Sequence, residues 1–226
     1  KRVGCPEYQM TAPVWIRGIL ADHHGVPVDS VTYLTGGEES PGRAEKIKLD
    51  LPPSIRVERI GPDQTLSRML ADGEIDALYT ARVPSTFRSA PDKVRRLFPD
   101  FMPVERDYFR KTGILPIMHV IALRRELYES QRWVAQTLTK AFIEAQKITY
   151  HDLTESAALK VMLPWLPAYV EQTVAELGQD FWPYGLAKNR ETLKTFLRYH
   201  YEQGLSKRVL EPEEIFAPET FESFVI

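Results

Sequence analysis

The first hundred residues alternate short strand-like runs with one amphipathic stretch after another. The runs "KRVG", "SVTYLTGG", "IRVERIG" and "IDALYTA" predict four strands. Apolar residues at helical spacing from Thr11 to His24, closed by Gly25, predict a helix, and a second helix is predicted to begin near Asp63 and stop at Gly73. Strands that alternate with helices favour a parallel sheet built from βαβ units. A polar loop, residues 36–53, separates the second and third strands.

The second half of the chain has a different pattern. The apolar run "GILPIMHVIAL" predicts one more strand, and from Gln131 onward the spacing is almost wholly helical. One helical stripe consists of Trp133, Leu138, Ala141, Phe142 and Ala145. We therefore expect an α/β lobe over residues 1–115, and over residues 116–226 a crossing strand and a helical C-terminal part.

Composition and charge narrow the classes of partner. The 226 residues are 43% hydrophobic, which is enough to bury a core. The 29 basic and 31 acidic side chains give a net charge of −2, so we expect no nucleic-acid partner. Cys5 is the single cysteine, which excludes an intrachain disulfide and metal clusters built on paired cysteines. The pair His23 and His24 suits a helix C-terminus, and we expect no metal there. No apolar run is long enough to span a bilayer.

Polar residues fill the turn between the first strand and its helix. They are Glu7, Tyr8, Gln9, Met10 and Thr11. In an open parallel sheet, ligands bind beyond the carboxyl ends of the strands, where a helix N-terminus offers free N–H groups. No glycine-rich cradle for a nucleotide phosphate is present, so we expect this turn to hold a carboxylate. The simpler interpretation is that Thr11 only caps the helix, although Tyr8 and Gln9 add polar reach that a cap does not need.

The end of the fourth predicted strand carries a second polar group. Tyr79, Thr80 and Arg82 follow the run "IDAL", again at a carboxyl end. The guanidinium of Arg82 suits a bidentate pair with a carboxylate, and a surface salt bridge is the alternative. Because neighbouring parallel strands end at the same edge, we expect Tyr79 and Arg82 to join the first turn in one site.

Several stretches together resemble a known family. They are "KRVGCPEYQMTAPVWIRGIL", "GEIDALYTARVP", "RRLFPD", "YFRKTGILPIMHVIALRRELYE", "FWPYGLAKNRETLKTFLRYHYEQGL" and "EEIFAPET". In these stretches the chain resembles the 4,5-dihydroxyphthalate decarboxylases, which are lyases of the type 2 periplasmic-binding-protein fold and close to a group of solute-binding proteins. The resemblance implies an α/β fold with two lobes and a cleft. Members of the family carry a further segment before the part that matches Lys1, so we expect the first lobe to be incomplete.

The resemblance also implies a reaction that needs no cofactor. The substrate would be 4,5-dihydroxyphthalate or a related aromatic dicarboxylate, and its loss of carbon dioxide requires a proton donor. We expect Tyr8, Gln9, Thr11 and Arg82 to hold carboxylates. His119, which interrupts the apolar run "PIMHVIAL", is the leading candidate for the acid, with Glu7 second. The alternative for His119 is a core histidine bonded to a backbone carbonyl.

A second function stays open on the sequence alone. The same fold serves proteins that capture a small aromatic or heterocyclic solute for transport without reacting. We expect a cytoplasmic enzyme, or a periplasmic protein if the binding alternative holds. An incomplete lobe would leave apolar helix surface uncovered, so we also expect a homo-oligomer.

Overall fold

The computed structural model describes residues 1–221 of the chain. These residues form two compact units, which are described separately here. The sheet unit consists of Lys1–Met118 together with Lys194–Leu210. The helical unit consists of His119–Leu193 and the residues from Glu211 onward.

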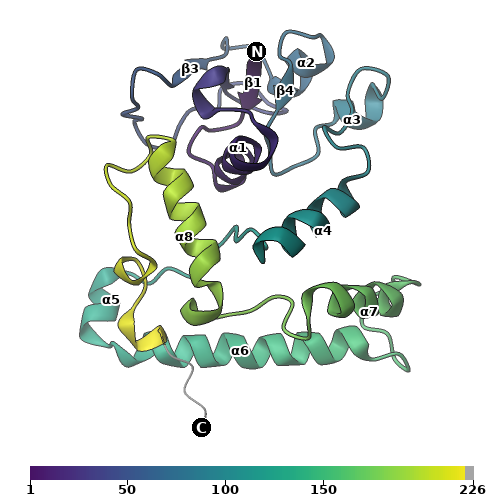
Figure 1. Cartoon of the computed structure of the whole chain (residues 1–226), viewed down its shortest axis with the longest axis vertical. Coiled ribbons are helices and arrows are strands. Elements are labelled where there is room, and N and C mark those ends of the chain that lie inside the picture. The colour runs from purple at the N-terminus through teal and green to yellow at the C-terminus, as the bar shows by residue number, and fades with distance from the viewer. Residues whose placement is uncertain (222–226) are drawn as a thin grey trace. The chain divides into compact units, whose positions relative to one another are not determined.

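Four short strands form the sheet of the first unit (Figure 1). They are β1 (Arg2–Cys5), β2 (Thr32–Thr35), β3 (Arg56–Arg59) and β4 (Ala77–Leu78), in the order β3-β2-β1-β4. Every pairing is parallel, and β1 lies in the middle, with Gly4 opposite Leu34 of β2 and Leu78 of β4. The predicted parallel α/β sheet is thus confirmed, although β4 is shorter than the run "IDALYTA" indicated.

Helices cover both faces of this sheet. The helix α1 (Thr11–His24) has the predicted bounds and ends at Gly25, whose φ of 65° is the left-handed conformation that glycine adopts readily. One face of the sheet packs against α1 in a cluster that includes Val3, Cys5, Tyr8, Leu20, Tyr33 and Tyr79. The other face packs against α2 (Leu66–Ala71) in a cluster of Leu34, Ile60, Leu66, Met69 and Ile75.

Glycine allows the close approach of α2 to the central strand. A Cβ atom on Gly4 would lie 2.7 Å from the Ile75 side chain and 3.1 Å from that of Leu66. The small residue in β1 therefore lets the second cluster close over the strand.

The sheet unit also includes elements beyond the sheet, α1 and α2. It contains the 3₁₀ turn η1 (Val28–Ser30), α3 (Thr86–Ser89), which lies next to α2, and α4 (Phe101–Thr112). The C-terminal half of α8 (Leu186–Glu202) also belongs to this unit. Val14, Trp15, Ile114 and Tyr199 form the third buried cluster.

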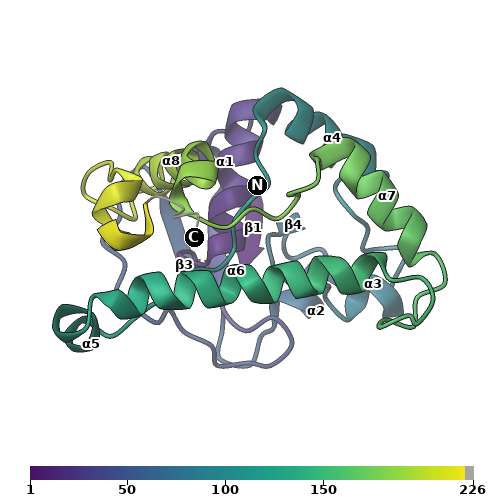
Figure 2. The same cartoon turned by 90° about the horizontal axis from the view of Figure 1, so that it is seen from below.

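The helical unit is built around α6 (Trp133–Thr154), a long uninterrupted helix (Figure 2). It is preceded by α5 (Arg125–Ser130) and followed by α7 (Leu166–Leu177), and α8 begins in this unit. Two 3₁₀ turns complete it, η2 (Pro212–Glu214) and η3 (Pro218–Thr220). Both α7 and η3 pack against α6. None of the described helices is long and apolar enough to cross a membrane.

One sequence expectation about this half of the chain was wrong. The segment "GILPIMHVIAL" forms no strand, because no strand of the described residues lies beside it to pair with its backbone. The apolar stripe of α6 is exposed at its two largest side chains, since Trp133 is 62% and Phe142 is 40% exposed. The packed face instead carries the buried Ala135, a small residue that lets neighbouring segments approach the helix closely.

Candidate functional site

The turn between β1 and α1 lies at the carboxyl end of the central strand. The helix begins at Thr11, and Met10 is its N-cap residue without a side-chain capping bond, so Thr11 is not the cap. Pro13 at the third helical position has no N–H group, and Val14 already donates to Met10 O. The unbonded donors of the first turn are therefore the N–H groups of Thr11 and Ala12.

Glu7 is held in this turn by an ion pair. Its side chain is 5% exposed, and Oε1 accepts from Arg43 Nη2 at 2.5 Å and from Arg43 Nε at 2.9 Å. Arg43 comes from the polar loop, residues 36–53, and is 40% exposed. Both bonds come from a charged donor, so they hold the Glu7 carboxylate firmly in the turn.

Tyr8 faces the candidate site with its backbone and the core with its side chain. The backbone N–H donates to Glu45 Oε1 at 2.6 Å, and the neighbouring Gln9 Nε2 donates to Glu45 Oε2 at 3.4 Å. The Tyr8 ring is fully buried, with its hydroxyl donating to Gln203 O at 3.1 Å. What Tyr8 offers to a ligand is therefore its N–H group.

A buried arginine on α1 holds this turn from the core side. Arg17 on α1 is 2% exposed, and its Nη2 donates to Tyr8 O at 2.6 Å while its Nε donates to Gln203 Oε1 at 2.7 Å. The guanidinium carbon lies 3.9 Å from the centre of the Tyr8 ring and 5.2 Å from that of Tyr33. Gln203 Nε2 in turn donates to Val14 O at 2.9 Å. The network joins the turn to α1 and to the residue that follows α8.

The charge of Arg17 acts on every titratable group around it. Burial raises the pKa of Cys5 and of Tyr8 to about 12, and the guanidinium opposes that rise at both positions. Burial also raises the pKa of Glu45, and the nearby Glu7 carboxylate adds to the rise. The Tyr8 N–H, the Gln9 amide and the Arg17 charge pull the pKa of Glu45 down without reversing the shift.

The end of β4 brings the second group of predicted residues to the same edge of the sheet. Tyr79 is buried in the cluster that contains Tyr8, and its N–H donates to Gly4 O at 2.8 Å. The Thr80 hydroxyl donates to the Glu38 carboxylate. Arg82 is exposed, and within residues 1–221 its guanidinium forms no ion pair. Its backbone N–H donates to Thr80 Oγ1 at 3.2 Å.

His119 belongs to the helical unit, whereas the other candidate residues belong to the sheet unit. It is the first residue of the helical unit, in a segment without helix or strand, and it is exposed. The alternative of a buried core histidine is therefore wrong, because an exposed imidazole needs no backbone partner to replace water. Its role as an acid stays a prediction.

Sequence reasoning missed three side chains that shape the turn. Arg43 and Glu45 lie in a loop whose contacts are long-range, and the pattern "GRAEK" indicates only a polar segment. Arg17 did leave a signal, as the lone charge within the otherwise apolar stretch "VWIRGIL". A charge inside an apolar helical run often marks a buried polar contact.

An open groove adjoins Glu45. Its volume is about 490 Å³, and loop residues 44–49 line it together with Thr35, Val57, Glu58 and Arg59 of β2 and β3. Three cations, Lys46, Lys48 and Arg59, are among the lining residues. The described part of the chain contains no group of three or more histidine, cysteine or acidic residues that could hold a metal ion.

The geometry defines an α/β protein with a candidate anion site at the carboxyl edge of a parallel sheet. No family model matches the chain. All 226 residues are 38% identical to a protein from Comamonas testosteroni named 4,5-dihydroxyphthalate decarboxylase, and they cover 68% of it. A protein of the same name from Pseudomonas putida is 46% identical over 110 residues, which are 49% of this chain and 43% of that protein. The chain belongs to the 4,5-dihydroxyphthalate decarboxylase family, as its sequence stretches indicated.

Proposed function

We propose that this protein is a carboxy-lyase that decarboxylates 4,5-dihydroxyphthalate without oxidation. The observation that carries the proposal is the match along every residue of the chain to a relative named for that reaction. The second relative bears the same name. The alternative of a solute-binding protein has no comparable support.

The proposed chemistry requires no cofactor. Each carboxylate of the substrate has a phenol oxygen para to it, so ionisation of that oxygen pushes electrons onto the ring carbon that bears the carboxylate. Protonation of this carbon gives a ring ketone that is no longer aromatic. The bond to the carboxylate then breaks, carbon dioxide leaves, and the bonding electrons return to the ring, so that 3,4-dihydroxybenzoate remains. The protein has to bind the dianion, favour the phenolate and supply one proton.

The site residues take the following proposed roles. The Tyr8 N–H, Gln9, Met10 and Thr11 of the β1–α1 turn, with Tyr79 and the free guanidinium of Arg82, bind the substrate. His119 supplies the proton. Glu7 is the second candidate for the acid, and its ion pair with Arg43 holds the carboxyl group in the turn.

The direct test is an assay of the purified protein. We expect 4,5-dihydroxyphthalate to give equal amounts of carbon dioxide and 3,4-dihydroxybenzoate, measured by chromatography and gas release. Phthalate is the matched control, since it keeps both carboxylates but lacks the phenol oxygens that drive the reaction. A folded protein that binds phthalate and never converts 4,5-dihydroxyphthalate would contradict the proposal.

We also propose the type 2 periplasmic-binding-protein fold, with residues 1–115 as the ligand-binding lobe and 116–226 as the crossing and helical part. In support, the chain passes three times between the sheet unit and the helical unit, an interleaving typical of two-lobed hinge proteins. A crystal structure of the protein with phthalate tests both the fold and the lobe boundaries.

Self-association and a cytoplasmic location complete the proposal. Large apolar side chains are exposed on the helical unit, including Trp133, Met162 and Trp165, and we propose that a second copy of the chain covers them. Light scattering should then show a dimer or larger species, and a monodisperse monomer would contradict this. A cytoplasmic location fits a decarboxylase of metabolism, and cell fractionation tests this proposal.

A further inference from the structure

The polar loop, residues 36–53, binds the candidate substrate turn at two points. Arg43 pairs with Glu7, and two residues later Glu45 accepts from the Tyr8 N–H and from Gln9. Arg43 and Glu45, two positions apart in the loop, thus contact the consecutive turn residues Glu7, Tyr8 and Gln9. A carboxylate of the protein itself therefore uses the donors that are proposed to hold a carboxylate of the substrate.

The buried guanidinium beneath the turn shows why a carboxylate suits this position. Arg17 is almost fully buried, yet the atoms that accept its hydrogen bonds are neutral, Tyr8 O and Gln203 Oε1. Among residues 1–221, its Nη1 has no hydrogen-bond partner. A buried cation without a paired carboxylate is costly, and an anion held nearby offsets that cost. Glu45 supplies this anion, since its carboxylate accepts from the N–H group of Tyr8 at 2.6 Å while the carbonyl of the same residue accepts from Arg17 at 2.6 Å.

We propose that the Tyr8 N–H, the Gln9 side-chain amide and the Arg17 charge form the subsite for one carboxylate of the aromatic dicarboxylate, and that Glu45 competes with the ligand for it. The inference rests on the proposed function, because it takes the ligand class from there. Binding then exchanges one carboxylate for another at the same donors. The turn keeps its hydrogen bonds, and the loop gives up its contact through Glu45.

The size and openness of the adjoining groove fit this exchange. The groove of about 490 Å³ begins at Glu45 and is lined by three cations, so it offers room and opposite charge to the rest of a dianion. Glu45 itself sits on a loop segment whose neighbours Ala44 and Lys46 are exposed, so its side chain has solvent into which to swing.

The test compares phthalate binding to the wild type and three variants by calorimetry. In Glu45→Ala the competing carboxylate is gone, and we expect Kd to fall about tenfold or more relative to the wild type, the range expected for one charge-assisted hydrogen bond. Glu45→Gln keeps the shape and a neutral acceptor, so its gain should be smaller. Glu39→Ala is the matched control, because Glu39 holds the same loop through Ser85 N and Oγ at 2.7 and 2.6 Å, away from the turn.

Each outcome decides the inference. Tighter binding in Glu45→Ala with an unchanged Kd in Glu39→Ala supports competition at the subsite. An equal gain in both variants would show that loosening the loop is enough, and an unchanged or weaker Kd in Glu45→Ala would make Glu45 a structural latch; either result overturns the proposal. Should Glu45→Ala not fold, as judged by thermal melting, Glu45→Gln carries the same comparison.

A double variant tests whether the increase in phthalate affinity arises at this turn. Adding Gln9→Leu to Glu45→Ala should remove most of the increase in affinity, and full retention would overturn the assignment of the subsite to this turn. Turnover of 4,5-dihydroxyphthalate by the wild type is measured on the same preparation. Failure of the subsite with turnover intact leaves the proposed function standing, whereas absent turnover counts against the function itself.

Discussion

The ion pair between Glu7 and Arg43 should respond very unequally to the loss of each partner. The Glu7 side chain is 5% exposed, whereas that of Arg43 is 40% exposed. In Arg43→Met a buried carboxylate loses the cation paired with it. In Glu7→Gln the arginine keeps its contact with water, and the amide oxygen still accepts from it. The cost of each change therefore follows the burial of the group that stays.

The expected magnitudes come from the same geometry. Removing one partner of a fully buried pair costs about 3–5 kcal/mol, and the partial exposure of Arg43 reduces this to about 2–4 kcal/mol for Arg43→Met. Glu7→Gln loses the strengthening that charge gives to two hydrogen bonds but also removes a buried charge, so we expect about 1 kcal/mol. The exposed pair of Arg68 and Asp72 is the control, and Arg68→Met should cost no more than about 0.5 kcal/mol.

Urea unfolding of the four proteins, followed by tryptophan fluorescence and circular dichroism, measures these differences. The midpoint should shift in the order Arg43→Met, Glu7→Gln, Arg68→Met, at unchanged slope. Equal costs for Arg43→Met and Glu7→Gln would refute the reasoning. They would mean that the loop leaves the turn when Arg43 is lost, so that water reaches Glu7.

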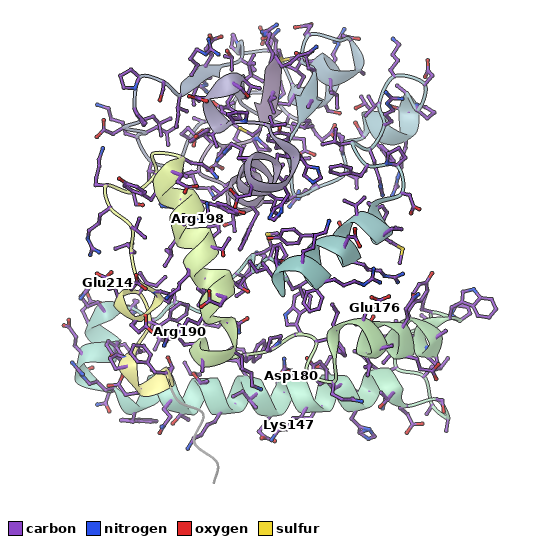
Figure 3. The ribbon with its side chains drawn as sticks, in the orientation of Figure 1. Lys147, Glu176, Asp180, Arg190, Arg198 and Glu214 are labelled. Carbon is purple, nitrogen blue, oxygen red and sulfur yellow. The ribbon has the colours of Figure 1, made fainter. Side chains whose placement is uncertain are left out.

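Three further changes test other parts of the molecule. Arg82→Lys should weaken phthalate binding about tenfold in calorimetry, because a point charge does not replace the planar fork, and an unchanged Kd would reduce Arg82 to a surface charge. His119→Asn should abolish turnover of 4,5-dihydroxyphthalate while phthalate affinity and melting temperature stay the same, and retained turnover would move the proton donor elsewhere. Burial acts to raise the pKa of Asp22, but hydrogen bonds from Arg198 and Tyr199 outweigh it and lower this pKa. The stabilisation that the Asp22 carboxylate gives is therefore present above its unfolded pKa and is lost as the pH falls through the folded value. Asp22→Asn, which removes one of the partners of the Arg198 labelled in Figure 3, should therefore cost about 1–2 kcal/mol at pH 7 and progressively less as the pH falls through the folded value in unfolding titrations, and a cost independent of pH would contradict the assignment.

Local patterns predicted the parts of the fold that depend on neighbours in sequence. The bounds of α1 and its end at Gly25 follow from spacing and from a glycine that adopts the left-handed conformation. The four strands and their parallel pairing follow from their alternation with helices. The same rules gave the β1–α1 turn as a place where polar groups gather at the carboxyl edge of a sheet.

Patterns failed where the outcome depends on a distant partner. An apolar run such as "GILPIMHVIAL" becomes a strand only if another strand lies alongside, and composition carries no record of that neighbour. On α6 the spacing located the apolar stripe, but which face is packed became visible only in the structure, where the small Ala135 is buried. Arg43 and Glu45 contact the turn across 36 and 37 residues of sequence, so their role became visible only in three dimensions.

The position of Tyr8 explains how one turn can serve both the loop and a ligand. Its carbonyl is held by Arg17, its hydroxyl by the backbone of Gln203, and its ring packs edge-on against Tyr33 with centroids 5.2 Å apart. None of these contacts involves the N–H group, so the direction of that donor is set from inside the core. A donor fixed in advance adds no ordering cost when its acceptor changes. Whether Glu45 or a substrate carboxylate binds the Tyr8 N–H group therefore depends on the charge of each carboxylate and on the conformational entropy that each loses on binding. The conformation of the turn stays the same in both cases.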